Sequence, residues 1–230
     1  MKKTLRLIAV AALAVVLASC MTAKTEKKNV AYAGMYEEKP VSVLLMPPIN
    51  RSTAVEAKEY FYSTLMTPVA EHGYYVIPPF ISMEILKRES AYDAERFLEA
   101  PLKKFGQLYG ADVALFTVIH KWDKSALFNT ITIDVEYIFR SVDTGATLYK
   151  RRGAIVYDTS VASGGGSIWA LVAKVAVNAI ATAATDYVPV SRQCNNYTLS
   201  DMPAGKYHKD FGLDGDKPAG APQFQASLKN

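Results

Sequence analysis

Two acidic side chains are the first candidates for chemistry in this sequence of 230 residues. Asp134 and Glu136 lie two positions apart in an alternating apolar and polar stretch, so both are expected on one face of a strand. Paired carboxylates can act as general acid and base. The basic run at 150–152 follows on the next expected strand, and opposite charges on neighbouring strands pair across a sheet. We therefore favour cross-strand ion pairs over a catalytic pair.

Metal and nucleophile chemistry has little support in the sequence. His72, His120 and His208 show no metal-ligand spacing, no Gly-x-Ser-x-Gly elbow occurs, and surface or capping roles are favoured for the histidines. The run Ser-Gly-Gly-Gly-Ser at 163–167 precedes an apolar stretch, as an anion-binding loop would, but it lacks the Gly-Lys-Ser/Thr ending of a nucleotide loop. We interpret it as a hinge with Ser167 as N-cap. The sequence thus predicts neither an enzyme nor a metal or cofactor site.

Cys20 is the residue whose surroundings predict a modification. A basic start, an apolar run over 7–17 and small residues before the cysteine are typical of a secretory signal peptide. The run is shorter than the roughly 20 residues that a membrane span needs. Leu17-Ala18-Ser19-Cys20 resembles a bacterial lipobox, in which the cysteine thiol receives diacylglycerol. We expect a signal peptide over 1–19 and a lipid anchor on Cys20; the alternative is an ordinary signal peptide that contains a cysteine.

The location follows from this anchor. Acyl chains at about 0.8 kcal/mol per buried methylene make such an attachment permanent. The next residue is Met21 rather than aspartate, which by the usual sorting of such lipoproteins implies the outer membrane, with the domain facing the periplasm.

The net charge and Cys194 limit the kinds of partner that the sequence predicts. The net charge of +4 loses three positive residues with the signal peptide, which leaves about +1. A nucleic-acid partner, which needs a clustered basic face, is not expected. Cys194 would then have no intramolecular partner, and we favour its burial over intermolecular pairing.

Hydrophobic periodicity predicts one domain of α/β class. We expect a lipid-anchored flexible tether over 20–39, an α/β domain over 40–190 and an irregular C-terminal tail over 191–230. Expected strands are 40–48, 74–80, 111–122, 130–140 and 146–158, and expected helices are 53–73, 80–88, 101–110 and 168–184. Strands separated by helices run parallel, whereas the last three form a meander. The fold class is therefore a three-layer sandwich whose mixed sheet has a parallel centre and an antiparallel hairpin at one side.

Details of two expected helices follow from single residues. Thr53 and Glu56 have the spacing of a capping box, Pro68 should kink the helix or end it early, and Gly73 is its expected stop. The apolar stretch 168–184 is too short to span a membrane and is interrupted by polar residues. We expect it to cover the sheet or to form a dimer face.

Several blocks of sequence resemble a known family. Residues 43–79 contain Pro-Pro-x-Asn, Ser-Thr and Pro-x-Ala-Glu-x-Gly-Tyr-Tyr-Val, and residues 109–122, 142–149 and 202–212 fit the same family in the same order. The family is that of the outer-membrane lipoproteins typified by a meningococcal genome-derived antigen. In the last block this chain reads Gly-Lys-Tyr-His-Lys where the family leads us to expect Gly-Pro-Tyr-His-Pro.

The resemblance implies a fold like the N-terminal domain of TolB, distantly like CsgG, with no established enzymatic activity. It implies a homodimer, attachment to the membrane through the lipid, and CsgG-like or other envelope lipoproteins as partners. The expected function is a non-catalytic scaffold of an envelope assembly or transport complex; the alternative is an accessory subunit that binds a lipid or another small ligand. The candidate partner or ligand surface comprises Ile168, Leu171, Val175, Tyr207 and His208.

Overall fold

A seven-stranded mixed sheet forms the centre of the protein. The structure is a computed structural model, and it describes residues 26–89, 92–125, 127–160 and 187–229. The strand order is β3-β1-β4-β5-β6-β7, and β2 pairs with β4 beside this path. The predicted mixed α/β sheet is confirmed.

The parallel strands occupy one side of the sheet. β1 (Ser42–Leu45) pairs in parallel with β3 (Tyr75–Val76) and with β4 (Val113–Ser125), and β2 (Ile49–Asn50) also runs parallel to β4. Leu44 and Leu45 are both fully buried although they point to opposite faces. β1 is therefore covered on both faces, as its unbroken apolar sequence predicted.

The antiparallel strands are longer and follow the predicted meander. β4 pairs with β5 (Thr130–Ser141), and β5 pairs with β6 (Thr147–Asp158). Along β5 the burial alternates strictly from Thr130 to Tyr137, with the apolar and aromatic members inside and the polar members half-buried. This pattern confirms the expectation of one buried and one wet face.

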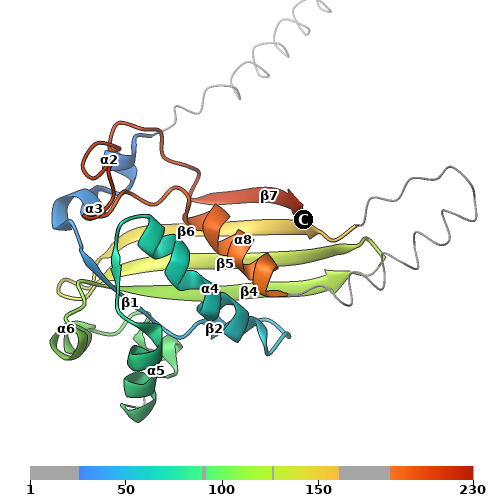
Figure 1. Cartoon of the computed structure of the whole chain (residues 1–230), viewed down its shortest axis with the longest axis horizontal. Coiled ribbons are helices and arrows are strands. Elements are labelled where there is room, and N and C mark those ends of the chain that lie inside the picture. The colour runs from blue at the N-terminus through green and yellow to red at the C-terminus, as the bar shows by residue number, and fades with distance from the viewer. Residues whose placement is uncertain (1–25, 90–91, 126, 161–186, 230) are drawn as a thin grey trace, which may run out of the picture.

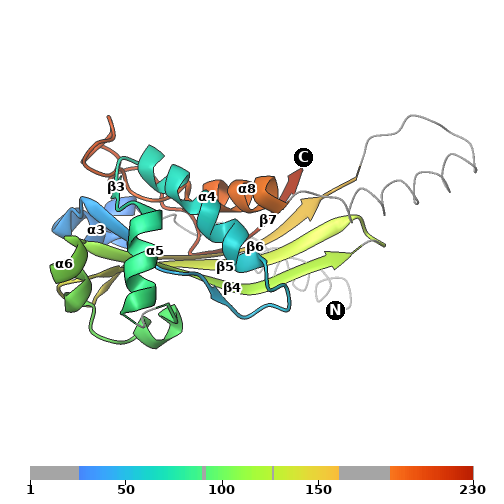
Figure 2. The same cartoon turned by 60° about the horizontal axis from the view of Figure 1, so that its bottom comes forward.

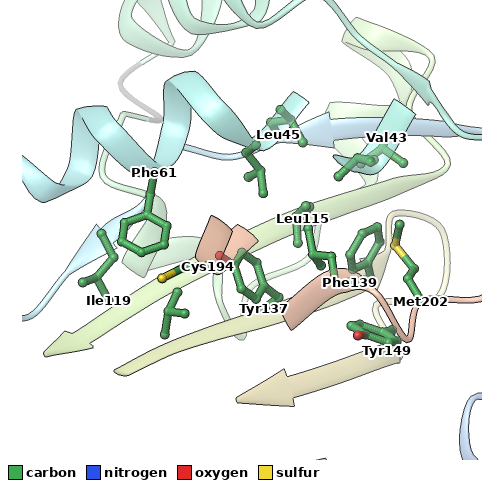
Figure 3. Packing of buried hydrophobic residues seen from close by; sticks show 14 of the residues in the cluster. Val43, Leu45, Phe61, Leu115, Ile119, Tyr137, Phe139, Tyr149, Cys194 and Met202 are labelled. Atoms are coloured by element: carbon green, nitrogen blue, oxygen red, sulfur yellow. The ribbon is translucent and has the colours of Figure 1, made fainter. Parts of the chain in front are cut away.

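Two helices cover the buried face of the antiparallel strands. α4 (Ala57–Glu71) and α8 (Tyr187–Leu199) lie side by side on it, as Figure 2 shows. Apolar side chains from both helices and from the sheet form the main core beneath them (Figure 3). A buried polar chain crosses this core: the Tyr137 hydroxyl donates to Asn195, whose amide donates to Thr64 Oγ1 at 2.8 Å and to the Phe61 carbonyl at 3.2 Å.

On the opposite face, the helices that the structure describes cover only the parallel strands. α5 (Pro79–Arg88), the short 3₁₀ helix η1 (Ala94–Phe97) and α6 (Lys103–Tyr109) pack there. Leu86, Phe105 and Phe116 belong to the smaller core cluster that they enclose. Together the helices and the sheet make the predicted three layers at this end of the molecule, whereas one face of the antiparallel half is left open by the described elements.

The segment expected to be a flexible tether is folded from residue 26 onward. It forms α2 (Lys28–Ala31) and α3 (Ala33–Glu38), and both Tyr32 and Met35 are buried in the main core. The prediction of a tether over 20–39 was therefore wrong for its second half. Tyr32 packs against Tyr149 with ring centroids 4.8 Å apart and ring planes tilted by 44°, so the segment packs directly on β6.

The C-terminal tail is also part of the domain. α8 continues to Leu199, and β7 (Gln223–Lys229) pairs in parallel with β6 as the last strand of the sheet. Phe224 of β7 packs over Gly153, where a Cβ would lie 2.4 Å from its ring. The predicted boundary at residue 190 and the irregular tail are thus corrected.

The ends of α4 agree only in part with the sequence. The capping box is absent: Glu56 is the N-cap residue, and it makes no capping hydrogen bond through its side chain. The helix continues past Pro68 to Glu71, because a proline in the last turn removes only one hydrogen bond of the helix. Gly73, with φ of +84°, follows the C-cap residue and ends the helical path as predicted.

Gly73 allows a comparison of two glycines in the left-handed region. A Cβ on Gly73 would meet the His208 backbone nitrogen at 2.3 Å, whereas Gly110 (φ +66°) has nothing within 4 Å. We expect Gly110→Ala to cost about 1 kcal/mol through its φ alone. Gly73→Ala should cost about 2–4 kcal/mol, because the tail must also move. Urea unfolding of both variants measures the difference, and equal losses would show that the tail yields freely.

Candidate functional site

Ion pairs cover the open face of the antiparallel strands. Arg152 donates two hydrogen bonds to the Asp134 carboxylate at 2.7 and 2.6 Å, and Lys150 Nζ lies 3.0 Å from Glu136 Oε1. The second oxygen of Glu136 is 2.9 Å from His120 Nε2. The predicted cross-strand pairing is confirmed, and His120 is an additional partner that the sequence did not indicate.

These contacts leave the two carboxylates engaged by cations. Burial opposes ionisation of Glu136, but the hydrogen bonds from His120 and Lys150 outweigh it and lower the pKa of the carboxyl. Such a carboxylate accepts hydrogen bonds and does not donate a proton near neutral pH. Within the described ranges no group of three or more His, Cys, Asp or Glu side chains is placed to hold a metal ion. We therefore interpret the network as structural.

The other predicted site residues have separate environments. His72 caps α4 through Nδ1, which lies 2.8 Å from the Pro68 carbonyl oxygen, and His208 Nδ1 accepts the Asp210 amide at 3.1 Å. Tyr207 is largely exposed beside it. Cys194 is buried in the main core, as predicted, and burial raises the pKa of its thiol. The network on the sheet and the pair Tyr207 and His208 therefore do not form one site.

Four predicted residues lie outside the described residues. They are Cys20, Ile168, Leu171 and Val175, and the expected helix 168–184 and hinge 163–167 lie outside as well. In the described part of the chain, each helix is either too short or too polar to cross a bilayer.

A buried lysine connects the two ends of the described chain. Lys28 Nζ lies 3.8 Å from Asp201 Oδ1 and 3.7 Å from Asp214 Oδ2, and all three side chains are at most 11% exposed. The Tyr32 hydroxyl donates to Asp201, and the Tyr36 hydroxyl donates to Asp214 at 3.0 Å. Each carboxylate therefore has the lysine and one phenol as partners.

Backbone amides complete this cluster. Gly220 N donates to Asp201 at 2.7 Å, and Ala204 N donates to Asp214 at 3.0 Å. Burial and the neighbouring carboxylates raise the pKa values of Tyr32 and Tyr36, so both phenols stay neutral donors. A buried charge needs such partners to offset its desolvation. We call Lys28, Asp201, Asp214, Tyr32 and Tyr36 the terminal clasp.

The terminal clasp was missed because its members are far apart in the sequence. Lys28 and its tyrosines belong to a stretch that reads as polar, and the two aspartates lie in a glycine-rich one. The spacing of Tyr32, Met35 and Tyr36, at three and four residues, was the signal of a helix with one apolar face.

A second contact joins the tail to the turn after α4. Gly205 N donates to the His72 carbonyl at 2.7 Å, and Tyr207 N donates to the Gly73 carbonyl at 2.9 Å. A Cβ on Gly205 would lie 2.6 Å from the Gly73 oxygen, so the two backbones touch. The Tyr74 hydroxyl donates to the Pro203 carbonyl at 2.8 Å. The sequence blocks around residues 73 and 205 thus form one contact.

A hollow of about 560 Å³ lies beside the terminal clasp. Tyr32, Leu148, Tyr149, Ala219 and Pro222 are among the residues that line it. Its size is within the range of small-molecule sites, and its walls are partly apolar.

Comparison with known proteins identifies the family. The family model described as "Putative lipoprotein GNA1162-like" matches residues 30–206, which is most of the chain. The chain belongs to this family. The curated "Putative lipoprotein NMB1124/NMB1162" of Neisseria meningitidis serogroup B is 30% identical over 176 residues, which cover 76% of this chain and 81% of that protein. The resemblance seen in the sequence is confirmed.

Solved structures include a GNA1162 protein. The crystal structure of lipoprotein GNA1162 from Neisseria meningitidis is 23% identical and covers 62% of this chain and 99% of that chain, with a TM-score of 0.49. The PelC dodecamer from Paraburkholderia phytofirmans is 12% identical, with 72% and 90% covered and a TM-score of 0.42. The LpoB C-terminal domain from Salmonella enterica is 15% identical, with 56% and 94% covered and a TM-score of 0.37. Similarity at this level carries no functional argument.

The terminal clasp predicts a large difference between two adjacent lysines. Lys28→Met should cost about 3–5 kcal/mol, because it leaves two buried carboxylates without their cation. Lys27 pairs with Asp216, but these side chains are 59% and 80% exposed, so Lys27→Met should change the unfolding free energy little. Urea unfolding of the two variants measures this difference. Similar losses would contradict the role of the clasp.

The network on the sheet predicts an effect of pH. The lowered pKa of Glu136 means that its stabilising charge is present above the ordinary value of 4.5 and is lost as the pH falls through the lower, folded value. Glu136→Gln should therefore lower stability at neutral pH and flatten the decline below pH 4.5. Unfolding midpoints across this range measure it. Glu37→Gln, at an exposed position of α3, is the control and should keep the wild-type profile.

Proposed function

We propose that this protein is a lipid-anchored, non-catalytic scaffold of an envelope assembly or transport complex, held at the outer membrane and facing the periplasm. Membership of a lipoprotein family and the lipobox-like sequence ending at Cys20 support the anchor. The paired network on the sheet supports a structural rather than a catalytic role for the charged residues.

One observation supports the membrane-proximal position that the proposal requires. The Ala219 amide donates to the Glu26 carbonyl at 2.7 Å, so the chain is fixed to the domain from Glu26 onward. Glu26 is six residues after Cys20, and a fully extended chain advances at most about 3.6 Å per residue, or about 22 Å in all. An anchor on Cys20 would therefore hold the domain close to the bilayer.

The long strands of the sheet place the β4–β5 turn far from the end of the domain that such an anchor would hold. The turn between β4 and β5 lies at the opposite end of the sheet from α2 and α3 (Figures 1 and 2). β4 has 13 residues, which span about 43 Å in a strand, and Leu127 and Phe128 in the turn are 79% and 73% exposed. Two exposed apolar side chains at a protruding turn suit contact with another envelope protein.

The hollow beside the terminal clasp favours a second candidate, an accessory subunit that binds a lipid or another small apolar ligand. Its volume of about 560 Å³ and its partly apolar walls are the supporting observation. The part of the candidate ligand surface that the sequence placed on residues 168–184 lies outside the described residues.

A crosslinked pull-down in mild detergent, with mass spectrometry of proteins and lipids, separates the two candidates. Recovery of a second envelope protein without enriched lipid would support the scaffold, and its loss in Leu127→Ser should place the contact at the β4–β5 turn. Enriched lipid without a protein partner would favour the accessory subunit. Leu108→Ser is the matched control, because Leu108 is also exposed, at 54%, but lies on α6.

Substitution of each of the two cysteines in the sequence tests the proposed anchor. We expect Cys20→Ala to remain unacylated and to leave the outer-membrane fraction. Cys194→Ala should stay in it, because Cys194 is buried in the core. Membrane fractionation and mass spectrometry of the Cys20 peptide measure both properties. Outer-membrane retention of Cys20→Ala would contradict the anchor.

A further inference from the structure

Exposed apolar side chains gather at the end of the domain where the anchor would leave it. Residues 205–217, which we call the anchor-side loop, contain Tyr207, Phe211 and Leu213, which are 67%, 38% and 75% exposed. Val30 of α2 is 58% exposed. These residues precede β7 or belong to α2, and Figure 1 shows both segments at the same end of the molecule.

Hydrogen bonds fix the anchor-side loop to the residues that follow the anchor. Asn29 N donates to the Gly215 carbonyl and Lys28 N donates to the Lys217 carbonyl, both at 3.0 Å. Asp214 of the loop also belongs to the terminal clasp. The loop therefore cannot separate from residues 26–29, and its position relative to the anchor is set by the fold.

Lysines accompany the exposed apolar residues. Lys217 pairs with Asp210 at 3.0 Å and Lys27 pairs with Asp216 at 2.6 Å, whereas Lys206 and Lys209 form no ion pair within the described residues. All four lysines are exposed. Aromatic and aliphatic side chains interspersed with lysines are typical of surfaces at the membrane interface, where the apolar groups enter and the ammonium groups meet phosphates.

We propose that the anchor-side loop is a membrane-contacting surface, on which Tyr207, Phe211 and Leu213 enter the interfacial layer of a phospholipid bilayer. This inference rests on the proposed anchor at Cys20, because a lipid within about 22 Å of Glu26 brings this loop, rather than the β4–β5 turn, to the bilayer. The lipid and the loop together give two attachments, which fix the orientation of the domain.

A fluorescent probe at the loop tests this proposal. Leu213→Cys, labelled with an environment-sensitive dye, is compared with Leu127→Cys, because the two leucines are 75% and 79% exposed at opposite ends of the domain. Cys194 is buried and Cys20 would be acylated, so the new cysteine takes the label. The full lipidated chain is reconstituted in vesicles of phosphatidylethanolamine and phosphatidylglycerol that contain a spin-labelled lipid as quencher.

We expect the probe at 213 to shift to the blue and to be quenched several-fold more strongly than the probe at 127. Adding Tyr207→Ser and Phe211→Ser to Leu213→Cys should reduce this quenching while the protein stays on the vesicles through its lipid. Either of two results would overturn the proposal. One is equal, weak quenching at both sites; the other is a blue shift at 213 without lipid quenching, which would show that protein covers the loop.

Flotation of the same samples separates this proposal from that of the anchor. Protein that floats with the vesicles while its probe at 213 remains aqueous would refute the membrane-contacting surface alone. Protein that is unacylated at Cys20 and does not float would refute the anchor, and the membrane-contacting surface with it.

Discussion

The ion pairing of the buried Lys28 ammonium group is the interaction on which the packing of α2 and α3 against the C-terminal segment depends. This ammonium group lies between Asp201 and Asp214, and no other cation lies within 4 Å of either carboxylate in the described part of the chain. A buried carboxylate without its cation is strongly destabilising, so the clasp has one stable arrangement. Because Lys28 and the aspartates come from opposite ends of the chain, this arrangement fixes α2 and α3 against the residues that lead to β7.

This closure gives the sheet two different ends. At one end the anchor-side loop is hydrogen-bonded to residues 28 and 29 of α2; at the other, β4 and β5 extend beyond the helices to their turn. A flexible segment of some 20 residues would have let the domain rotate freely. Because α2 and α3 are folded, only residues 21–25 separate Cys20 from the described domain, so an anchor there would act close to the clasp.

The sequence predicted the elements whose burial follows a local pattern. The alternation along residues 130–140 indicates a strand with one buried face, and the apolar run at 40–48 indicates a strand buried on both faces. Both regions contain a strand in the structure. The ion pair of Asp134 with Arg152 was predictable for the same reason, because neighbouring strands of a hairpin have a known relation in space.

Other elements depend on contacts that no short window contains. Tyr32 and Met35 are hidden among lysines and glutamates, and their burial requires β6 as a partner. The ring of Phe224 packs over Gly153 and against Tyr197. The guanidinium of Arg151 lies 4.5 Å from its centroid. Polar and apolar residues alternate along the short strand over 223–229, but its place at the edge of the sheet depends on these contacts of Phe224.

The turn at Gly205 shows how a local departure from the family pattern is tolerated. The resemblance leads us to expect prolines at positions 206 and 209, where this chain has lysines. Proline restricts a turn by fixing φ. Here hydrogen bonds from Tyr207 to Gly73 and from His208 to Gly205 hold the backbone, so the turn does not need the rings. Both lysines are exposed, and their ammonium groups add positive charge to the anchor-side loop.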